Sequence, residues 1–518
     1  MCNSPGDIQL YEEMQSRAFS DSYEQIIGWI RSRLIAEKNV NHQLSIAQFY
    51  GNIRWANFDG IYHDNDIEDI VELRVLQSKR LKLPDLSKME VRTVLIASEL
   101  YDVGGHSRVV LNWMKAFEEE GDHELLITRT ATKTIRASLK DQNISYRLCS
   151  NQGIDLVNEI LAYCANAGRV VLHTHPDDIV TAIAARILAK SGKRIIFYNH
   201  ADHVFSYGIS SAQLVCEISS YGIELNRRTQ RINKSCYLGI PIGFRGYKTH
   251  LEIPAEKKLN QTVISCGHPS KYAPASVFFG DFIDALLQQR SDVTVQLVGP
   301  TGNETWWATI KGRWGAQVQF LGELSHSKYL DTMQKADVYV DSFPITGGIA
   351  FPEALLNGKL VAGLVNAIQG YSPVDELRVG DVRTLTEQVI GLLKHDPISI
   401  RRMEEIREKA NAIHSITNFR ERVKRTYTGS YDRDVELHAS VDTYWIENEW
   451  RSGRRPMSVY RSYLWFEMFW GFCIPYTQML YRSSRIKGHE IALYVAKGLI
   501  RKLLPSIIRE SLISWLKV

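Results

Sequence analysis

Short runs of β-branched and aliphatic residues alternate with helix-compatible stretches along most of this 518-residue chain. The first run is VRTVLIAS, and others follow at HELLIT, RVVLHTH and KRIIFYNH, with stretches such as DDIVTAIAARILAKSG between them. The runs carry few charges, as is typical of strands that are buried on both faces of a parallel sheet. This alternation predicts an α/β fold with a doubly wound sheet.

The same alternation starts again in the middle of the chain. Gly239, Pro241 and Gly243 interrupt the periodicity in SCYLGIPIGFRGYK, which predicts a hinge. Beyond it, strands are expected at TVISCG, VTVQLVG, VQFLG, ADVYVD and KLVAGLV, with helices between them. Two Rossmann-like domains in tandem are therefore expected, an N-terminal one at 91–240 and a C-terminal one at 241–430.

A helical accessory region is expected at residues 1–90. Its clearest segment is DSYEQIIGWIRSRLIAEKN, in which Ile26, Ile27, Ile30 and Leu34 are spaced to lie on one face of a helix. Hydrophobic residues make up 44% of the chain and charged residues 23%, which is the composition of a folded globular protein rather than of a disordered one.

The C-terminal residues, 431–518, are expected to form a basic helical extension. Positions 451–518 hold twelve Lys and Arg against three Asp and Glu, although the whole chain has a net charge of only +4. Aliphatic residues near helical spacing accompany these charges, so the segment has two readings: it lies on an anionic membrane surface, or it packs against the N-terminal half.

The cellular setting follows from what the chain contains. The first fifteen residues carry acidic side chains and no apolar run, and no stretch of about 18 apolar residues occurs anywhere, so neither a secretory signal nor a spanning helix is expected. The seven cysteines are scattered without a CxxC pair, which disfavours a disulfide framework or a zinc cluster. A cytoplasmic protein is expected, peripheral at the inner face of the plasma membrane if the basic tail binds lipid.

Polar residues that follow the predicted strands of the first half are the first candidates for chemistry, because ligands of parallel α/β sheets bind at the carboxyl ends of the strands. A diglycine turn with a histidine, Gly104, Gly105 and His106, precedes a helix, where backbone N–H groups favour negative charge. A denser polar group directly follows RIIF and includes His200, Asp202 and His203. His173 and His175, after the preceding strand, are expected to line the same cleft, and no metal-ligand spacing is present.

The second half offers candidates for binding a phosphorylated ligand. Lys271 lies in the loop after the first strand of this half, where its ammonium would neutralise a phosphate. The loop Thr346, Gly347 and Gly348 leads into a short helix, and free N–H groups there are suited to cradle a diphosphate. Glu353, on that helix, is placed to accept hydrogen bonds from a ribose.

Across roughly residues 91–430 the chain resembles the GT-B glycosyltransferases. The resemblance rests on five motifs in order: GGxxRV after the first strand, a His after a mid-domain strand, IPIG at the junction, FLGELSHSKYLDTMQKADVYVD, and PEALLNGKLV. In this comparison Glu353 takes the place of the ribose-binding glutamate of a Glu-x7-Glu motif. Ile345 stands where the other glutamate would be, so a retaining or an inverting reaction stays open.

The segment SCGHPSKYAPASVFFGDFIDALLQQRSDVTVQLVG is similar to the protein O-GlcNAc transferase family and its bacterial relatives. That likeness implies that Lys271 contacts the diphosphate of a UDP-sugar and that the Thr346 loop lies beside it. NHADHVFSYG is similar to a motif of bacterial glycosyltransferases with this kind of C-terminal half.

These resemblances imply a glycosyltransferase that moves a hexose from a nucleotide sugar to an acceptor. The implied acceptor is a glycan or a lipid-linked saccharide, in surface polysaccharide assembly, or else a protein. No metal cofactor and no nucleic-acid partner are expected. His200, His203 or His106 is the expected general base, with Asp202 next. Three alternatives stay open: a protein-modifying transferase, a sugar-nucleotide epimerase and a non-catalytic binding protein. A dinucleotide oxidoreductase is disfavoured because no GxGxxG follows the first strand.

Overall fold

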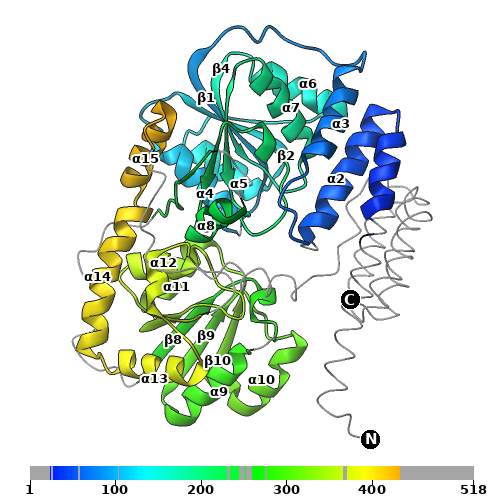
Figure 1. The fold of residues 1–518 in the computed structure, drawn as a ribbon. Helices are drawn as coiled ribbons and strands as arrows, with labels where there is room; N and C mark the ends of the chain where they lie inside the picture. Colours follow the sequence, from blue (N-terminus) through cyan, green and yellow to red (C-terminus); the bar gives the residue numbers. More distant parts are fainter. Residues whose placement is uncertain are drawn as a thin grey trace, which may run out of the picture.

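The computed structural model describes residues 24, 27–56, 59–102, 104–229, 234–243, 251, 260–274, 277–365 and 370–431 (Figure 1). The prediction for the basic extension at 431–518 falls almost wholly outside these residues. In the part that is described, no helix is both long and apolar enough to span a bilayer.

The first half is built on a seven-stranded parallel sheet in the order β3-β2-β1-β4-β5-β6-β7. Its strands are β1 Glu90–Leu100, β2 His123–Ala131, β3 Tyr146–Leu148, β4 Ala167–His173, β5 Arg194–Asn199, β6 Leu214–Glu217 and β7 Ser235–Tyr237. Its helices are α4 Gly105–Ala116, α5 Lys133–Asp141, α6 Gly153–Tyr163, α7 Ile179–Lys190 and α8 Ser220–Thr229. This is the Rossmann strand order, extended by one strand.

The second half has a six-stranded parallel sheet in the order β10-β9-β8-β11-β12-β13. Its strands are β8 Gln261–Cys266, β9 Val293–Val298, β10 Val318–Gly322, β11 Val338–Val340, β12 Leu360–Leu364 and β13 Arg378–Val379. Its helices are α9 Phe279–Gln289, α10 Ala308–Trp314, α11 His326–Lys335, α12 Ala350–Leu356, α13 Val382–Leu393 and α14 Pro397–His414. The strand order is again that of a Rossmann domain, so the predicted tandem α/β fold is confirmed.

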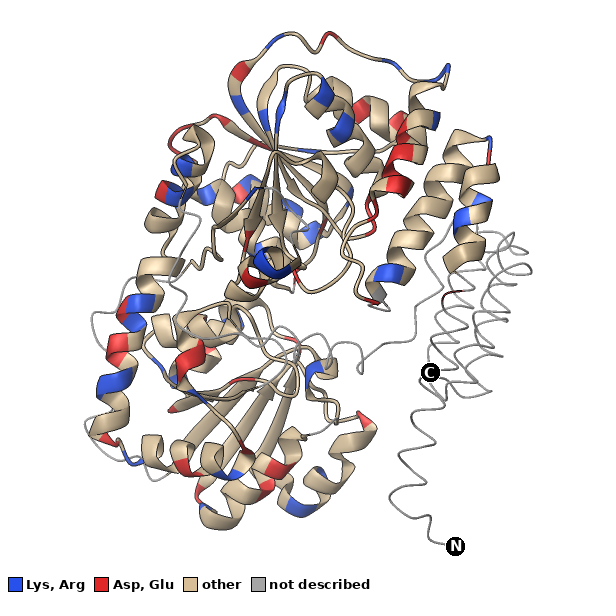
Figure 2. Cartoon of the chain, in the orientation of Figure 1, with Lys and Arg blue, Asp and Glu red and all other residues tan. Residues whose placement is uncertain are grey.

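Strand β1 shows why the sheets are buried on both faces. Its residues Leu95 and Ala97 belong to one hydrophobic cluster, whereas Val94 and Ile96 belong to a second cluster on the opposite face. Successive side chains of a strand point to opposite faces, so both faces of this strand are covered. In Figure 2 the strands of both sheets are mostly free of charged residues, whereas the surrounding helices carry many of them.

The predicted helical accessory region is present in the described residues that precede β1. Residues 27–36 are helical, followed by α2 Val40–Ala56 and α3 Asn65–Leu76. Asp64 caps α3 by accepting a hydrogen bond from the Ile67 N–H. Helices α2 and α3 pack on α6 and α7, and the region therefore extends the first half rather than forming a separate body.

The last described helix, α15 Ile416–Thr428, returns from the second half to the first (Figure 1). Phe419 packs edge-on against Trp113 of α4, with ring centroids 5.1 Å apart. The Tyr427 hydroxyl lies 2.9 Å from Nε2 of His123 in β2. Two tandem Rossmann-like halves clasped by a returning C-terminal helix are the GT-B arrangement.

Candidate functional site

The carboxyl edges of the two sheets hold the histidine candidates, Lys271 and the Thr346 loop that the sequence predicts as site residues. In each sheet the strand order reverses beside the first strand, between β1 and β4 in one half and between β8 and β11 in the other. Ligands of open α/β sheets bind in the crevice at such a reversal. The candidate loops follow β1, β4 and β5 in the first half and β8 and β11 in the second.

The diglycine turn after β1 places a histidine at the start of α4. Gly104 has a φ of 133°, a value that side chains other than hydrogen disfavour, and α4 begins at Gly105. The Nε2–H of His106 then donates to the carbonyl of His173, 2.8 Å away. The turn therefore brings the end of β1 to the end of β4.

Three histidines form one cluster at this edge. Nδ1 of His173 and Nε2 of His200 are 2.8 Å apart, and the rings of His106 and His200 have centroids 4.3 Å apart. Burial lowers the pKa of all three imidazoles, and each is lowered further by its neighbours in the cluster or by His175. They are therefore neutral at ordinary pH. No hydrogen bond in the described part of the chain joins His200 to a carboxylate.

His203 has a different setting, because a carboxylate lies behind its ring. Its Nδ1 is 3.0 Å from Oδ1 of Asp202, whose side chain is fully buried. Asp202 also accepts hydrogen bonds from the hydroxyls of Ser219 and Tyr371, the latter at 3.4 Å. Among the histidines predicted as the base, His203 is the one whose ring these contacts hold against a carboxylate. Asp202, also predicted as a base, is the partner of this imidazole.

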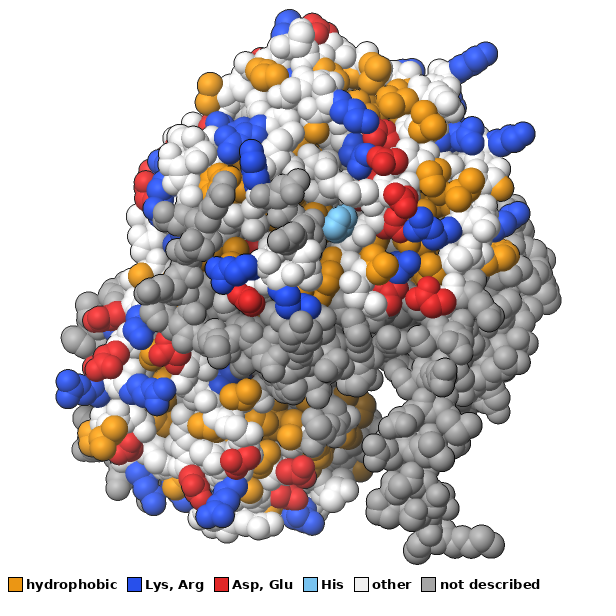
Figure 3. All heavy atoms as spheres, in the orientation of Figure 1, with side chains coloured by type: hydrophobic (Ala, Val, Ile, Leu, Met, Phe, Trp, Pro, Cys, Tyr) orange, Lys and Arg blue, Asp and Glu red, His pale blue; other side chains and the backbone are white. Residues whose placement is uncertain are grey.

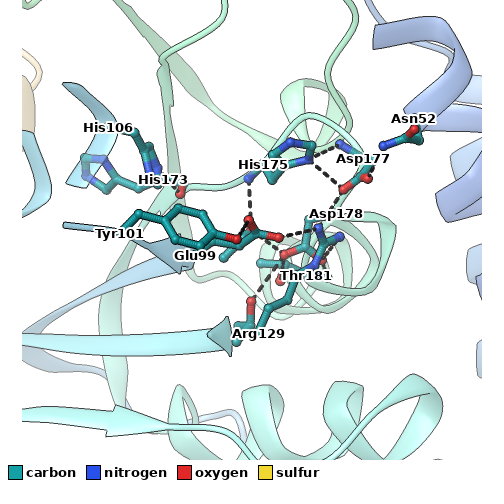
Figure 4. A network of polar contacts seen from close by, with 12 residues as sticks. Asn52, Glu99, Tyr101, His106, Arg129, His173, His175, Asp177, Asp178 and Thr181 are labelled. Carbon is teal, nitrogen blue, oxygen red and sulfur yellow. Dashed lines mark hydrogen bonds and ion pairs between the residues drawn. The ribbon is translucent and has the colours of Figure 1, made fainter. Parts of the chain in front are cut away.

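A second carboxylate-backed histidine lies after β4 (Figure 4). Nδ1–H of His175 donates to Oδ1 of Asp177 at 2.7 Å, and Nη1 of Arg129 donates to the same oxygen at 2.7 Å. The other oxygen accepts from Asn52 of α2 at 3.0 Å. Burial alone would raise the pKa of Asp177. The positive charge of Arg129 and the hydrogen bond from His175 outweigh this effect, so the pKa of Asp177 is lowered. This network, which the sequence did not reveal, ties α2 to the sheet edge.

In the second half, Lys271 and the loop after β11 lie together. Lys271 is on the short 3-10 turn Pro269–Tyr272, and its Nζ donates to the Thr346 carbonyl at 2.8 Å. Its side chain is half-buried, not the solvated surface lysine that a loop position favours. Both residues stand at the reversal between β8 and β11, where an anionic ligand is expected.

The predicted cradle of free N–H groups is not open along its whole length. The Gly347 N–H donates to the carboxylate of Asp341, at 3.3 Å from both oxygens. Asp341 is fully buried, and Arg378 donates to it at 2.8 Å. A buried carboxylate needs several donors, and the loop supplies one of them. For Gly347 the expectation of a free N–H was therefore wrong in this structure.

The two halves meet at these loops. A Cβ atom on Gly105 of the first half would lie 2.9 Å from Ile349, which precedes α12, and the hydroxyl of Tyr371 in the second half lies 3.4 Å from Asp202 in the first. Glu353 of α12 is fully buried and receives a hydrogen bond from Arg108 of α4. The sequence did not single out Arg108, although it stands inside the GGxxRV motif.

The described residues provide no metal centre, and on one face of the molecule they show no strongly one-signed patch. No group of three or more His, Cys, Asp or Glu side chains among them is arranged to hold a metal ion. On the face drawn in Figure 3, their basic and acidic side chains are interspersed over both halves.

No protein-family model matches this chain, and no curated protein matches it by sequence. Among solved structures, it is similar to HepE of Anabaena in complex with UDP and glucose, at 14% identity and a TM-score of 0.49, over 65% of this chain and 100% of HepE. It is also similar to a mutant of the Thermobaculum terrenum O-GlcNAc transferase, at 13% identity and a TM-score of 0.49, over 84% of this chain and 82% of that one.

The lipopolysaccharide outer core galactosyltransferase WaaB is a third similar structure, at 14% identity and a TM-score of 0.46, over 65% of this chain and 99% of WaaB. Likenesses at this level show the fold and not the reaction, which has to follow from the residues at the sheet edges. This chain is thus a GT-B-fold protein by its own topology, with glycosyltransferases among the solved structures similar to it.

Proposed function

We propose that this protein is a glycosyltransferase that moves a sugar from a nucleotide sugar, most simply a UDP-sugar, to an acceptor held by the first half. One observation carries the proposal. Tyr371 of the second half links the two predicted sites, because its hydroxyl lies 3.4 Å from Asp202 of the first half and its ring lies near Gly348. The His203–Asp202 pair is therefore one side chain away from the loop that accompanies Lys271.

This arrangement fits a direct displacement. The acceptor oxygen forms a bond to the anomeric carbon, the bond from that carbon to the diphosphate oxygen breaks, and Nε2 of His203 takes the acceptor proton. Asp202 fixes the tautomer by holding Nδ1–H and stabilises the imidazolium that forms, as a carboxylate does behind a catalytic histidine. A single displacement inverts the anomeric centre, so NMR of the product tests this part of the proposal.

Lys271 would stabilise the negative charge that gathers on the departing diphosphate. Preorganised charge of this kind is often the largest contribution to catalysis. Its hydrogen bond to the Thr346 carbonyl holds the ammonium at the strand-order reversal of the second half. With that charge supplied by the protein, we propose that the reaction needs no metal ion.

Binding of the donor can be tested with the purified full chain. Nucleoside diphosphates and their sugars with uracil, guanine and thymine bases would be screened by thermal shift. A ligand that binds only the native state raises stability by about 2.7 kcal/mol at roughly 100 times its Kd. A rise in Tm for one base over the others supports the proposal, and no shift with any of them contradicts it.

Lys271→Ala is expected to weaken binding of the preferred nucleoside diphosphate by about ten- to hundredfold, because a charge-assisted hydrogen bond is lost. Losing the hydrogen bond to the Thr346 carbonyl should lower the free energy of unfolding by only about 1 kcal/mol. Calorimetric titration measures the affinity and urea unfolding the stability. Lys394→Ala, an exposed lysine of the same half, serves as the control. Unchanged affinity in Lys271→Ala would remove this residue from the donor site.

We further propose that the acceptor is a glycan or lipid-linked saccharide of surface polysaccharide assembly, reached at the inner face of the plasma membrane, with a protein acceptor as the alternative. The charge of the C-terminal residues supports this, since twelve Lys and Arg stand against three Asp and Glu in 451–518. Basic segments are attracted to anionic lipid, and salt screens the attraction.

The full chain is expected to co-sediment with vesicles that contain anionic lipid, whereas a chain ending near Ser483 binds them less. Raising the ionic strength should release the full chain, because the attraction is electrostatic. Neutral vesicles provide the control. Equal, salt-insensitive binding of both chains would contradict a membrane role for this segment.

A further inference from the structure

An ion pair joins the two halves at the nucleotide site proposed above, and this inference rests on that site. Nη2 of Arg108, in α4 of the first half, donates to Oε1 of Glu353, in α12 of the second. Nε2 of His326, from α11, lies 2.9 Å from the same oxygen. One carboxylate oxygen therefore serves two donors from opposite sides of the boundary between the halves.

The second oxygen of Glu353 is in a different situation. The side chain is fully buried, and its Oε2 has no hydrogen-bond partner in the part of the chain that the structure describes. A buried carboxylate oxygen without a donor is unfavourable, because it has lost its water without a replacement. An external hydrogen-bond donor is therefore expected at Oε2. A carboxylate accepts only, so the complementary group is one that carries O–H or N–H.

Arg108 helps to determine which way this oxygen points, together with His326. A guanidinium is planar and rigid, so its bond to Oε1 restricts the rotation of the carboxylate. The approach of the two elements is close as well, since a Cβ atom on Gly105 would lie 2.9 Å from Ile349. The first turns of α4 are thus held against the start of α12, and Arg108 stays within reach of Glu353.

We propose that Arg108 is a positioning residue that orients Glu353 so that its free oxygen receives the ribose hydroxyls of the donor nucleotide. Recognition of the ribose then depends on contact between the halves, because the orienting group lies on α4 of the first half and the binding group on α12 of the second. A deoxyribose lacks one hydroxyl and gains less from this oxygen. Arg108 therefore affects recognition of the ribose and not recognition of the base.

The test compares the affinities of the full chain for UDP and for 2′-deoxy-UDP by calorimetric titration. The wild type is expected to prefer UDP by about tenfold or more, the effect of one hydrogen bond to a charged acceptor. In Arg108→Met the preference should fall to within about threefold, which corresponds to less than about 0.7 kcal/mol. Lys115→Met changes an exposed residue of the same helix and should keep the wild-type preference.

The ratio separates positioning from general damage, since a distorted site would weaken both nucleotides alike. Arg108→Lys, which retains the charge, should keep part of the preference. In a Glu353→Gln background, Arg108→Met should have no further effect on the ratio. A wild-type ratio in Arg108→Met, or a wild type that binds both nucleotides equally, would overturn this inference alone. A wild type that binds no nucleoside diphosphate would overturn the proposed function and this inference with it.

Discussion

Replacing His203 with alanine is expected to lower the rate of sugar transfer about 10²- to 10⁴-fold, which is the usual contribution of a general base. Affinity for the nucleoside diphosphate should stay unchanged, because the imidazole belongs to the half that holds the acceptor. Asp202→Asn should also slow transfer, since an amide can present the wrong hydrogen-bonding group to Nδ1 of His203. Single-turnover transfer and calorimetric titration measure the two quantities.

The three-histidine cluster provides the comparison. His200 is held by His173 through its Nε2, and burial keeps the pKa of His200 low, so it is a poor base in this structure. His200→Ala should therefore slow transfer less than His203→Ala does. Loss of transfer in His200→Ala, combined with full activity in His203→Ala, would move the base to the cluster.

Replacing Arg129 with methionine is expected to reduce the free energy of unfolding by about 3–5 kcal/mol at neutral pH, as removal of one partner from a buried ion pair does. Arg129 lies 2.7 Å from an oxygen of Asp177, 3.6 Å from Asp178 and 3.5 Å from Glu99. Three carboxylates would be left at one sheet edge without their shared cation (Figure 4). Arg80→Met, which removes an exposed ion pair with Asp155, should change stability by about 0.5 kcal/mol or less.

The deficit of Arg129→Met should shrink as the pH falls. The folded protein holds the pKa of Asp177 below its usual value, so this group stabilises the wild type above the ordinary aspartate pKa of about 4 and loses that effect as the pH falls through the folded value. Without Arg129 the carboxylate protonates more readily, which relieves its unpaired charge. Urea unfolding at about pH 7 and about pH 3 measures the difference, because the second value lies below the ordinary aspartate pKa. A deficit that is equal at both values would mean that lost packing, not charge, is responsible.

The elements that the sequence predicts well are those with a strong repeating pattern. A helix was expected between the strands VQFLG and ADVYVD, and α11 spans His326–Lys335 there, where Ser325 caps it and three buried residues share one face. Strand β7, Ser235–Tyr237, was missed because it falls in the segment interpreted as a hinge. Strand β13, Arg378–Val379, was missed as well, because it has only two residues. Strands this short have no periodicity of their own, and their pairing with a neighbouring strand defines them.

The candidate site, like the fold, could be predicted from the sequence only in part. The sequence could place Lys271 and Thr346 in loops after strands, and a parallel sheet then brings such loops to one edge. It could not show that Arg108 meets Glu353, because the two residues are 245 positions apart and the contact depends on how the halves are oriented. It could not show that Asp341 takes the Gly347 N–H, since only the folded loop brings them together.

The release of nucleoside diphosphate from a nucleotide sugar tests the central claim most directly. The purified full chain would be incubated with the donor that its thermal shift selects, with and without saccharide and lipid-linked acceptors. We predict that the nucleoside diphosphate appears with an acceptor, together with an equal amount of glycosylated product, and that His203→Ala releases almost none. A changed sugar on an intact nucleotide without any acceptor would instead indicate an epimerase. Tight binding with no turnover under any condition would indicate a binding protein. An epimerase or a binding protein would each contradict the proposal that this chain is a glycosyltransferase.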